Sequence, residues 1–258
     1  MLAPGEHVLG VVLAAGWRYN PGVSRFLNKP ADFSGPKQLT AMLRMTFEDG
    51  EERWILTDEN WQAGRGAQTF ALVFDGSSWD DRESRPGWDL PGFSGEGFSA
   101  ARPLPAPGGA MRPMLIPPVM EHVLRAPVAA WPVGGGVVMD FGQNLAGVLR
   151  VPFPAGLKPG QRVELIHSEE LTVDGLPFCD TLRGAKAEDV YTASGDGRDL
   201  AVWQPEFTYH GFRYAMIRGL GEDFDAQGVR AVELHTALRE TGSFRCGSAL
   251  VTRIHELC

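Results

Sequence analysis

The sequence predicts an all-β protein, and three features of its 258 residues support this fold class. Thirty-two glycines and nineteen prolines are spread between short apolar runs, as expected where many turns join short strands. Apolar and polar residues alternate in many of these runs with the period of two that is typical of half-buried strands. Helical periodicity is nearly absent. The length exceeds what one compact core usually needs, so we expect two units of roughly 100 to 130 residues.

The first apolar run covers residues 8–15. We interpret it as a buried strand, because no Lys or Arg precedes it, as one would in a signal peptide. The run is also far shorter than the roughly 20 residues of a transmembrane helix. No export signal is visible, so we expect a cytoplasmic protein that has no membrane partner.

Strand patterns then recur along the chain. Residues 38–47 and 53–57 flank the turn sequence Glu48-Asp49-Gly50-Glu51, which predicts a hairpin. In the run 207–218, the pair His210-Gly211 interrupts the alternation and predicts a bulge. Further strands are expected at 68–75, 119–125, 136–140, 145–151, 161–167, 187–193 and 228–236.

Two segments separate the units. Residues 103–117 are rich in proline, which lacks the N–H that a strand ladder needs, and are expected to be a linker. We therefore place a first unit at 1–102 and a second at 118–240. In 241–258, Ser248 can cap a helix whose apolar residues follow at helical spacing up to Leu257.

Charge and cysteine content exclude several functions. The net charge of −8 provides no basic surface for phosphates, so no nucleic-acid partner is expected. The three cysteines are far apart and have no C-x-x-C spacing, so neither a disulfide framework nor a zinc site is indicated. This cysteine usage fits a reducing compartment.

The most informative feature is an ordered series of motifs. Asp140-Phe-Gly-Gln-Asn-Leu-Ala-Gly147 is followed by His167-Ser-Glu-Glu-Leu171, by the run 183–191 and by the run 203–214, which contains Phe207-Thr-Tyr-His-Gly-Phe-Arg-Tyr214. The series resembles the β-sandwich that precedes the catalytic barrel in bacterial α-L-rhamnosidases. The resemblance implies two consecutive antiparallel β-sandwich domains of the jelly-roll type, followed by the start of a helical segment.

The same resemblance implies a function. Residues 1–102 would be a truncated sandwich of the carbohydrate-module type, 118–240 a complete concanavalin-like sandwich, and 241–258 the entry into an absent α/α barrel. The chain would then be the accessory, non-catalytic portion of an enzyme that hydrolyses terminal α-L-rhamnose from rhamnosides, and no catalytic residue is assigned to it. Its partners would be the barrel domain and a rhamnose-containing glycan or glycoside. A free-standing rhamnose-binding protein or a scaffold protein remains the alternative.

A structural polar cluster is expected within the second unit. Its members are Asp140, Glu169, Arg183, His210 and Arg213, and Glu169 is expected to pair with one of the two arginines. Glu169 and Glu170 are adjacent in a predicted strand, so their side chains point to opposite faces and do not form a catalytic pair.

Candidate ligand-binding residues lie in the first unit. The segment Gly16-Trp17-Arg18-Tyr19 and the run 80–88 resemble parts of a rhamnosidase module that binds rhamnose with calcium in some members. Trp17 could stack on a sugar, or it could fill the core of the sandwich. Asp75, Asp80 and Asp81 are candidate calcium ligands, because Ca²⁺ prefers oxygen.

Overall fold

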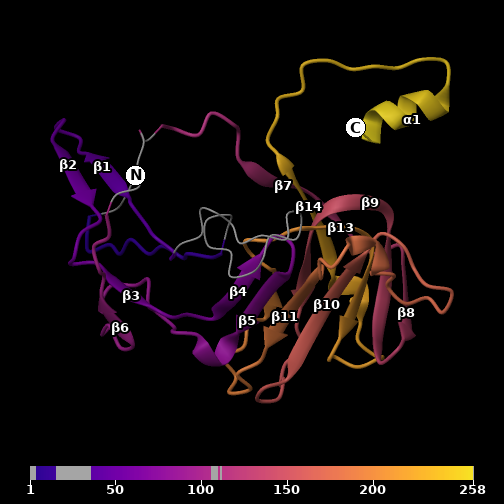
Figure 1. Cartoon of the computed structure of the whole chain (residues 1–258), viewed down its shortest axis with the longest axis horizontal. Helices are drawn as coiled ribbons and strands as arrows, with labels where there is room; N and C mark the ends of the chain where they lie inside the picture. Colours follow the sequence, from indigo (N-terminus) through magenta and orange to yellow (C-terminus); the bar gives the residue numbers. More distant parts are fainter. Residues whose placement is uncertain (1–3, 16–35, 106–109, 111, 258) are drawn as a thin grey trace.

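The computed structural model describes residues 4–15, 36–105, 110 and 112–257. Within these residues strands dominate, and one α-helix follows them near the C-terminus (Figure 1). The all-β prediction is confirmed. The N-terminal half contains two small sheets. Most of the C-terminal half belongs to one strongly curved sheet, which folds over into two layers that enclose the hydrophobic core (Figure 1).

The large sheet has ten strands. Eight form the path β4-β5-β11-β10-β13-β9-β14-β7, while β8 and β12 pair with β9. Every pairing is antiparallel except that of β5 with β11, which is parallel. The strands are β4 Gln68–Leu72, β5 Gly76–Asp80, β7 Val119–Arg125, β8 Ala129–Val133, β9 Gly136–Pro152, β10 Arg162–Ser168, β11 Glu188–Thr192, β12 Val202–Trp203, β13 His210–Arg218 and β14 Arg230–Thr236.

Strand β9 organises this sheet, because it pairs with four other strands. Strand β13 pairs with residues 136–140 and 145–147 of β9, whereas β8 pairs only with residues 136–140, and β14 and β12 pair only with residues 147–152. The strand therefore passes from one layer to the other, as Figure 1 shows where β9 curls over the sheet. Two separate strands were predicted here, at 136–140 and 145–151, and the structure joins them.

The curl coincides with a bulge. Between Phe212 and Tyr214 the strand β13 contributes one residue, while β9 contributes the four residues between Asp140 and Leu145. Gly142 lies in this bulge at φ +75°, a conformation that residues with a Cβ rarely adopt. The bulge predicted at His210-Gly211 is therefore wrong in position, since both of those residues pair regularly with β9.

The core follows the predicted alternation. In β10, Val163, Leu165 and His167 are fully buried and the residues between them are partly exposed. Phe212 packs edge-on against Phe141 with ring centroids 5.8 Å apart. Each fully buried aliphatic or aromatic side chain of this kind stabilises the fold by roughly 1.5–3 kcal/mol.

Three strands of the large sheet were not predicted: β5, β8 and the two-residue β12. Strand β5 has the sequence Gly-Ser-Ser-Trp-Asp, which lacks the apolar alternation that marks a strand. Strand β8 contains Pro132, which lowers the strand signal and is tolerated at a sheet edge. A two-residue turn, Gly134-Gly135, joins β8 to β9 with φ of +58° and +78°, as a type I′ hairpin requires.

The N-terminal unit contains two small sheets. The predicted hairpin is present as β1 Met42–Thr46 and β2 Glu52–Leu56, and β3 Gln62–Gly64 pairs with β6 Phe98–Ala100. Residues 8–13, by contrast, are exposed and form no strand, so the prediction of a buried strand there is wrong. An apolar run alone does not form a strand when no partner strand accepts its backbone hydrogen bonds.

Strands β4 and β5 link the two predicted units. Both lie before the proline-rich linker, yet β5 hydrogen-bonds to β11 in the sheet formed by the later residues. Trp79 of β5 also packs against the hydrophobic core of that sheet. The sheet therefore includes residues from both sides of residues 103–117, a feature that the predicted division at residue 102 did not include.

The predicted helix is present as α1 Ala249–Leu257. Ser248 caps it, because the Val251 N–H donates to Ser248 Oγ at 3.4 Å. No residue of α1 is buried, and its apolar side chains at Leu250 and Ile254 are more than half exposed. The helix contacts the β9 bulge, where Arg253 Nη2 donates to Gln143 Oε1 at 2.8 Å.

Candidate functional site

The β9 bulge brings together the first pair of predicted polar residues. Asp140, at the start of the bulge, accepts two hydrogen bonds from the guanidinium of Arg213 on β13, at 2.9 and 2.8 Å. The Gly142 N–H donates to the same carboxylate at 2.6 Å. The Arg213 hydrogen bond is the main reason that the pKa of Asp140 lies below its ordinary value. This bidentate pair fixes the geometry of the bulge.

The side-chain amides of the bulge make contacts with two other segments. Asn144 Nδ2 donates to Glu169 Oε1 at 2.7 Å, and Gln143 accepts from Arg253 of α1. Glu169 thus contacts an amide, and Arg213 is paired with Asp140, so the predicted pairing of Glu169 with an arginine is not what the structure shows. Arg183 is exposed at the end of a short 3₁₀ turn, in a left-handed conformation with φ 51°. Three of the five predicted residues therefore surround the bulge, and Arg183 lies in a separate exposed turn.

His210, the remaining member, belongs to a buried group. Its Nε2 lies 3.0 Å from Asp189 Oδ2, and the His167 Nε2 lies 3.9 Å from the same oxygen. Both imidazole rings stack, with centroids 4.3 Å apart. Burial is the largest cause that lowers the pKa of His167, to about 3, so this ring is neutral at pH 7.

Sequence reasoning did not assign a role to His167 or Asp189. The sequence nevertheless contained a signal for His167, because alternation along the predicted strand places it on the same, core-facing side as Val163 and Leu165. A polar residue on the core face of a strand needs a partner within the core. The neighbouring strand β11 provides Asp189, whose side chain is fully buried.

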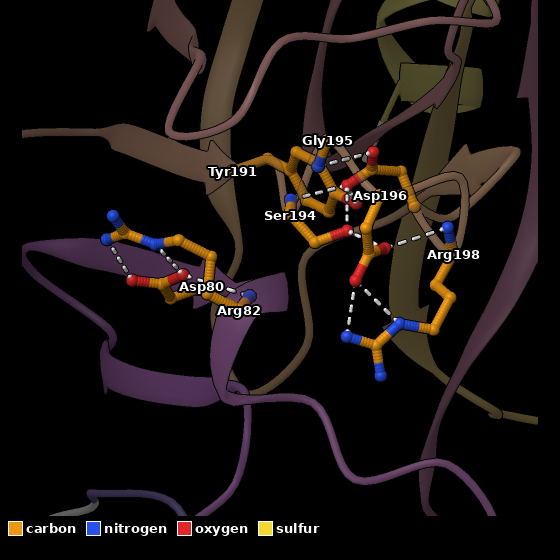
Figure 2. A network of polar contacts seen from close by, with 8 residues as sticks. Asp80, Arg82, Tyr191, Ser194, Gly195, Asp196 and Arg198 are labelled. Atoms are coloured by element: carbon orange, nitrogen blue, oxygen red, sulfur yellow. Dashed lines mark hydrogen bonds and ion pairs between the residues drawn. The ribbon is translucent and has the colours of Figure 1, made fainter.

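The predicted calcium ligands do not gather around one point. Asp80 ends β5 and caps the next turn, and its carboxylate accepts hydrogen bonds from the side chain of Arg82 at 2.8 and 2.6 Å (Figure 2). The Arg82 hydrogen bond is the main reason that the pKa of Asp80 is lowered. Asp75 lies in the turn between β4 and β5, where its N–H donates to the Leu72 carbonyl.

Asp81 differs from its neighbours because it is buried. Its Oδ1 accepts a hydrogen bond from Trp79 Nε1 at 3.1 Å, and its Oδ2 has no hydrogen-bond partner among the described residues. Within the described part of the chain, the group of three metal-ligand side chains that converges is His167, Asp189 and His210. Calcium binding by Asp75, Asp80 and Asp81 stays a prediction.

Beside Asp80 lies a loop that sequence reasoning did not assign. It joins β11 to the residues before β12, and Figure 2 shows it next to the Asp80–Arg82 pair. Asp199 accepts hydrogen bonds from the backbone N–H groups of Ser194 and Gly195, at 2.6 and 2.9 Å, and from the Tyr191 hydroxyl at 3.3 Å. Burial is the main reason that the pKa of Tyr191 is raised. These contacts hold the loop in place through its own carboxylate.

The remaining sequence predictions concern sugar binding and the membrane. Trp17 lies outside the described residues, so its role in sugar binding stays a prediction. In the described part of the chain, no helix is long and apolar enough to cross a membrane.

Comparison with known proteins identifies the family. Residues 1–123 match the family described as "Alpha-L-rhamnosidase N-terminal domain", and residues 133–235 match the family described as "Bacterial alpha-L-rhamnosidase concanavalin-like domain". The chain belongs to the bacterial α-L-rhamnosidase family. The resemblance seen in the motif series is thereby confirmed.

Relatives within this family are much longer. The chain is 28% identical to an α-L-rhamnosidase of Formosa agariphila and 30% identical to one of Streptomyces avermitilis, over 99% and 98% of its own length. It covers only 27% and 24% of those two proteins. The chain thus spans about a quarter of the length of the rhamnosidases it matches.

Solved rhamnosidase structures share the fold. The α-L-rhamnosidase from Dictyoglumus thermophilum aligns with a TM-score of 0.82 and 29% identity, over 93% of this chain and 26% of that chain. The Streptomyces avermitilis α-L-rhamnosidase, solved in complex with L-rhamnose, aligns with a TM-score of 0.80 and 27% identity, over 93% of this chain and 23% of that chain.

Proposed function

We propose that this chain is the accessory, non-catalytic portion of an α-L-rhamnosidase that hydrolyses terminal α-L-rhamnose from rhamnosides. The observation that carries the proposal is the extent of the match, which covers an N-terminal domain, a concanavalin-like domain and about a quarter of each relative. The remaining three quarters of such an enzyme would contain its catalytic carboxylates.

Three carboxylates of the motif series support a non-catalytic role. Hydrolysis of a glycoside usually needs two carboxyl groups, one on each side of the scissile bond and open to the substrate. Asp140 is neutralised by Arg213, Glu169 accepts a hydrogen bond from Asn144, and Asp189 is completely buried. These three carboxylates are therefore engaged in holding strands and turns together.

The surface around the β9 bulge is suited to contact the rest of the enzyme. Helix α1 lies at this end of the sandwich, and Arg253 joins it to Gln143. The helix exposes an apolar stripe that includes Leu250 and Ile254, at 71% and 53% exposure. A helical catalytic barrel that packs on α1 would cover this stripe, and the rigid bulge would then set its position.

The test is a reconstitution experiment. The α-L-rhamnosidase of Streptomyces avermitilis would be produced without the quarter that this chain matches, and its hydrolysis of an aryl α-L-rhamnoside would be measured with and without the purified chain. We expect activity to rise when the chain is added and the two proteins to co-elute in gel filtration.

Matched variants sharpen the result. Gln143→Ala removes the contact between the bulge and α1 and should weaken the complex. Lys158→Ala is the control, because Lys158 is exposed in the loop before β10, whereas the residue that contacts the bulge, Glu169, follows the other end of β10. This variant should leave the complex unchanged. If the added chain neither binds the truncated enzyme nor changes its activity, the accessory role is wrong.

A further inference from the structure

Three metal-ligand side chains meet in the core of the sandwich, away from the bulge and α1. His167 comes from β10, Asp189 from β11 and His210 from β13, which are neighbouring strands in the sheet. Their side chains are 0%, 0% and 3% exposed. One ligand atom from each lies within 4.8 Å of the others. A polar group of this kind is costly in a core unless each member has a partner.

His167 is the member whose partner is missing. Its Nδ1 lies 3.0 Å from the Ala187 carbonyl, which only accepts, so Nδ1 carries the proton and Nε2 presents a lone pair. This Nε2 is buried and has no hydrogen-bond partner among the described residues. A histidine whose one ring nitrogen donates to a backbone carbonyl while the other faces inward has the arrangement of a metal ligand.

Asp189 is oriented in a similar way. Its Oδ1 accepts a hydrogen bond from the Ser77 N–H at 2.8 Å, which leaves Oδ2 to face both imidazoles. The distances from Oδ2 to the two Nε2 atoms are 3.0 and 3.9 Å. Two ligands of a tetrahedral zinc ion with bonds near 2.0 Å are separated by about 3.3 Å, a value between these two distances.

We propose that His167, Asp189 and His210 bind one divalent transition-metal ion of the zinc type. Two neutral imidazoles and one carboxylate suit Zn²⁺ or Co²⁺ better than Ca²⁺, which prefers oxygen ligands only. The ion replaces the hydrogen bond between His210 and Asp189, and the proton that His210 Nε2 donates in that bond is released to solvent or moves to Nδ1 as the metal binds. One imidazole turns out of the present ring stack, so that both Nε2 lone pairs converge on the metal.

The role of such an ion would be structural. Because all three ligands are buried, the ion enters while the chain folds. It joins β10, β11 and β13, and through the Ser77 hydrogen bond to Asp189 it also holds β5, the strand from the N-terminal half. The site therefore lies where the two halves of the chain meet, and this inference does not depend on the proposed function.

The test uses the full, untagged chain, stripped of metal with a chelator under denaturing conditions. It is refolded with or without Co²⁺ or Zn²⁺ and passed through a desalting column. We expect one metal ion per chain, visible absorption bands of tetrahedral Co²⁺, and a midpoint of thermal unfolding raised by roughly 5–10 °C with Zn²⁺. A refolded wild-type chain that retains no metal would overturn the proposal.

Variants locate the ion. Asp189→Asn keeps the shape of the side chain and should lose the Co²⁺ bands, as should His167→Gln. The matched control is His235→Gln. His235 stacks on His122, and these two exposed residues are the other pair of described histidines whose rings are in contact. Bands that disappear in His235→Gln and persist in His167→Gln would place the metal at the surface and refute the buried site.

A measurement on the wild-type chain covers the case in which the core variants do not fold. Imidazole ¹⁵N resonances respond to Zn²⁺ when the ring nitrogen becomes a ligand. We expect two histidines to shift, and their nuclear Overhauser contacts to place them beside Phe212, which lies 4.9 Å from the His167 ring centroid. Shifts confined to the exposed histidines would contradict the proposal.

Discussion

Gly76 is the residue at which the attachment of the N-terminal strands can be tested most sharply. It begins β5 at φ +81°, and a Cβ added there would lie 1.9 Å from the Glu188 carbonyl oxygen of β11. Contacts of this kind below 3.0 Å are essentially never seen, so Gly76→Ala must separate β5 from β11 by about 1.1 Å. The buried hydrogen bond from the Ser77 N–H to Asp189, now 2.8 Å long, cannot survive that displacement.

The expected cost follows from these two effects. A left-handed conformation costs a residue with a Cβ roughly 1–2 kcal/mol, and loss of a hydrogen bond to a charged group costs roughly 1.5–3 kcal/mol. We therefore expect Gly76→Ala to lower the free energy of unfolding by about 3–5 kcal/mol. Urea unfolding followed by tryptophan fluorescence measures this change, because Trp79 lies on the displaced strand.

The control is Gly66→Ala. Gly66 is exposed just before β4, and an added Cβ would have no heavy atom within 4 Å. This variant should stay within about 0.5 kcal/mol of the wild type. Limited proteolysis should also show that Gly76→Ala exposes residues 36–100 to cleavage, while residues 119–236 stay protected. A Gly76→Ala variant as stable as Gly66→Ala would refute the close packing of β5 on β11.

Two further predictions concern polar contacts of the sandwich. Because pairing with Arg213 lowers the pKa of Asp140 below its ordinary 3.8, the pair stabilises the fold above that pH, and the contribution is lost as the pH falls through the lowered pKa. Asp140→Asn should thus lower the urea midpoint at pH 7, and its difference from the wild-type midpoint should shrink below pH 3.8. An equal difference at both pH values would contradict this. Tyr191→Phe removes the hydroxyl that accepts from the Leu200 N–H and donates to Asp199, so it should lower the free energy of unfolding by about 1–3 kcal/mol in the same assay. No change in stability would show that neither contact contributes.

Sequence patterns predicted much of the fold, because half-buried strands leave a strong signature. The alternation in 161–167 and 228–236 corresponds to β10 and β14 within two residues at each end. Strand β5 had no such signature. Its position depends instead on close backbone contact at Gly76 and on the hydrogen bond from Ser77 to Asp189, two residues that are 112 positions apart in the sequence. Pairings over such sequence distances are set by tertiary packing, which a local pattern does not record.

The candidate sites show the same division. The motif Asp140-Phe-Gly-Gln-Asn144 was recognised as important, and the structure explains it as a bulge closed by Arg213. The partners of Glu169 and His210 could not be predicted, because several residues of suitable charge were available. Which side chain a residue meets on the neighbouring strand changes when the register shifts by one residue, and register is fixed by the turns and the whole core.

The central claim is that this chain is a non-catalytic portion of an α-L-rhamnosidase, and an activity assay of the purified chain alone tests it most directly. The account predicts no release of rhamnose from an aryl α-L-rhamnoside above the buffer rate, because three carboxylates of the motif series, Asp140, Glu169 and Asp189, are engaged in structural contacts. Turnover that co-elutes with the pure chain and is abolished by Glu169→Gln or Glu170→Gln would contradict the account.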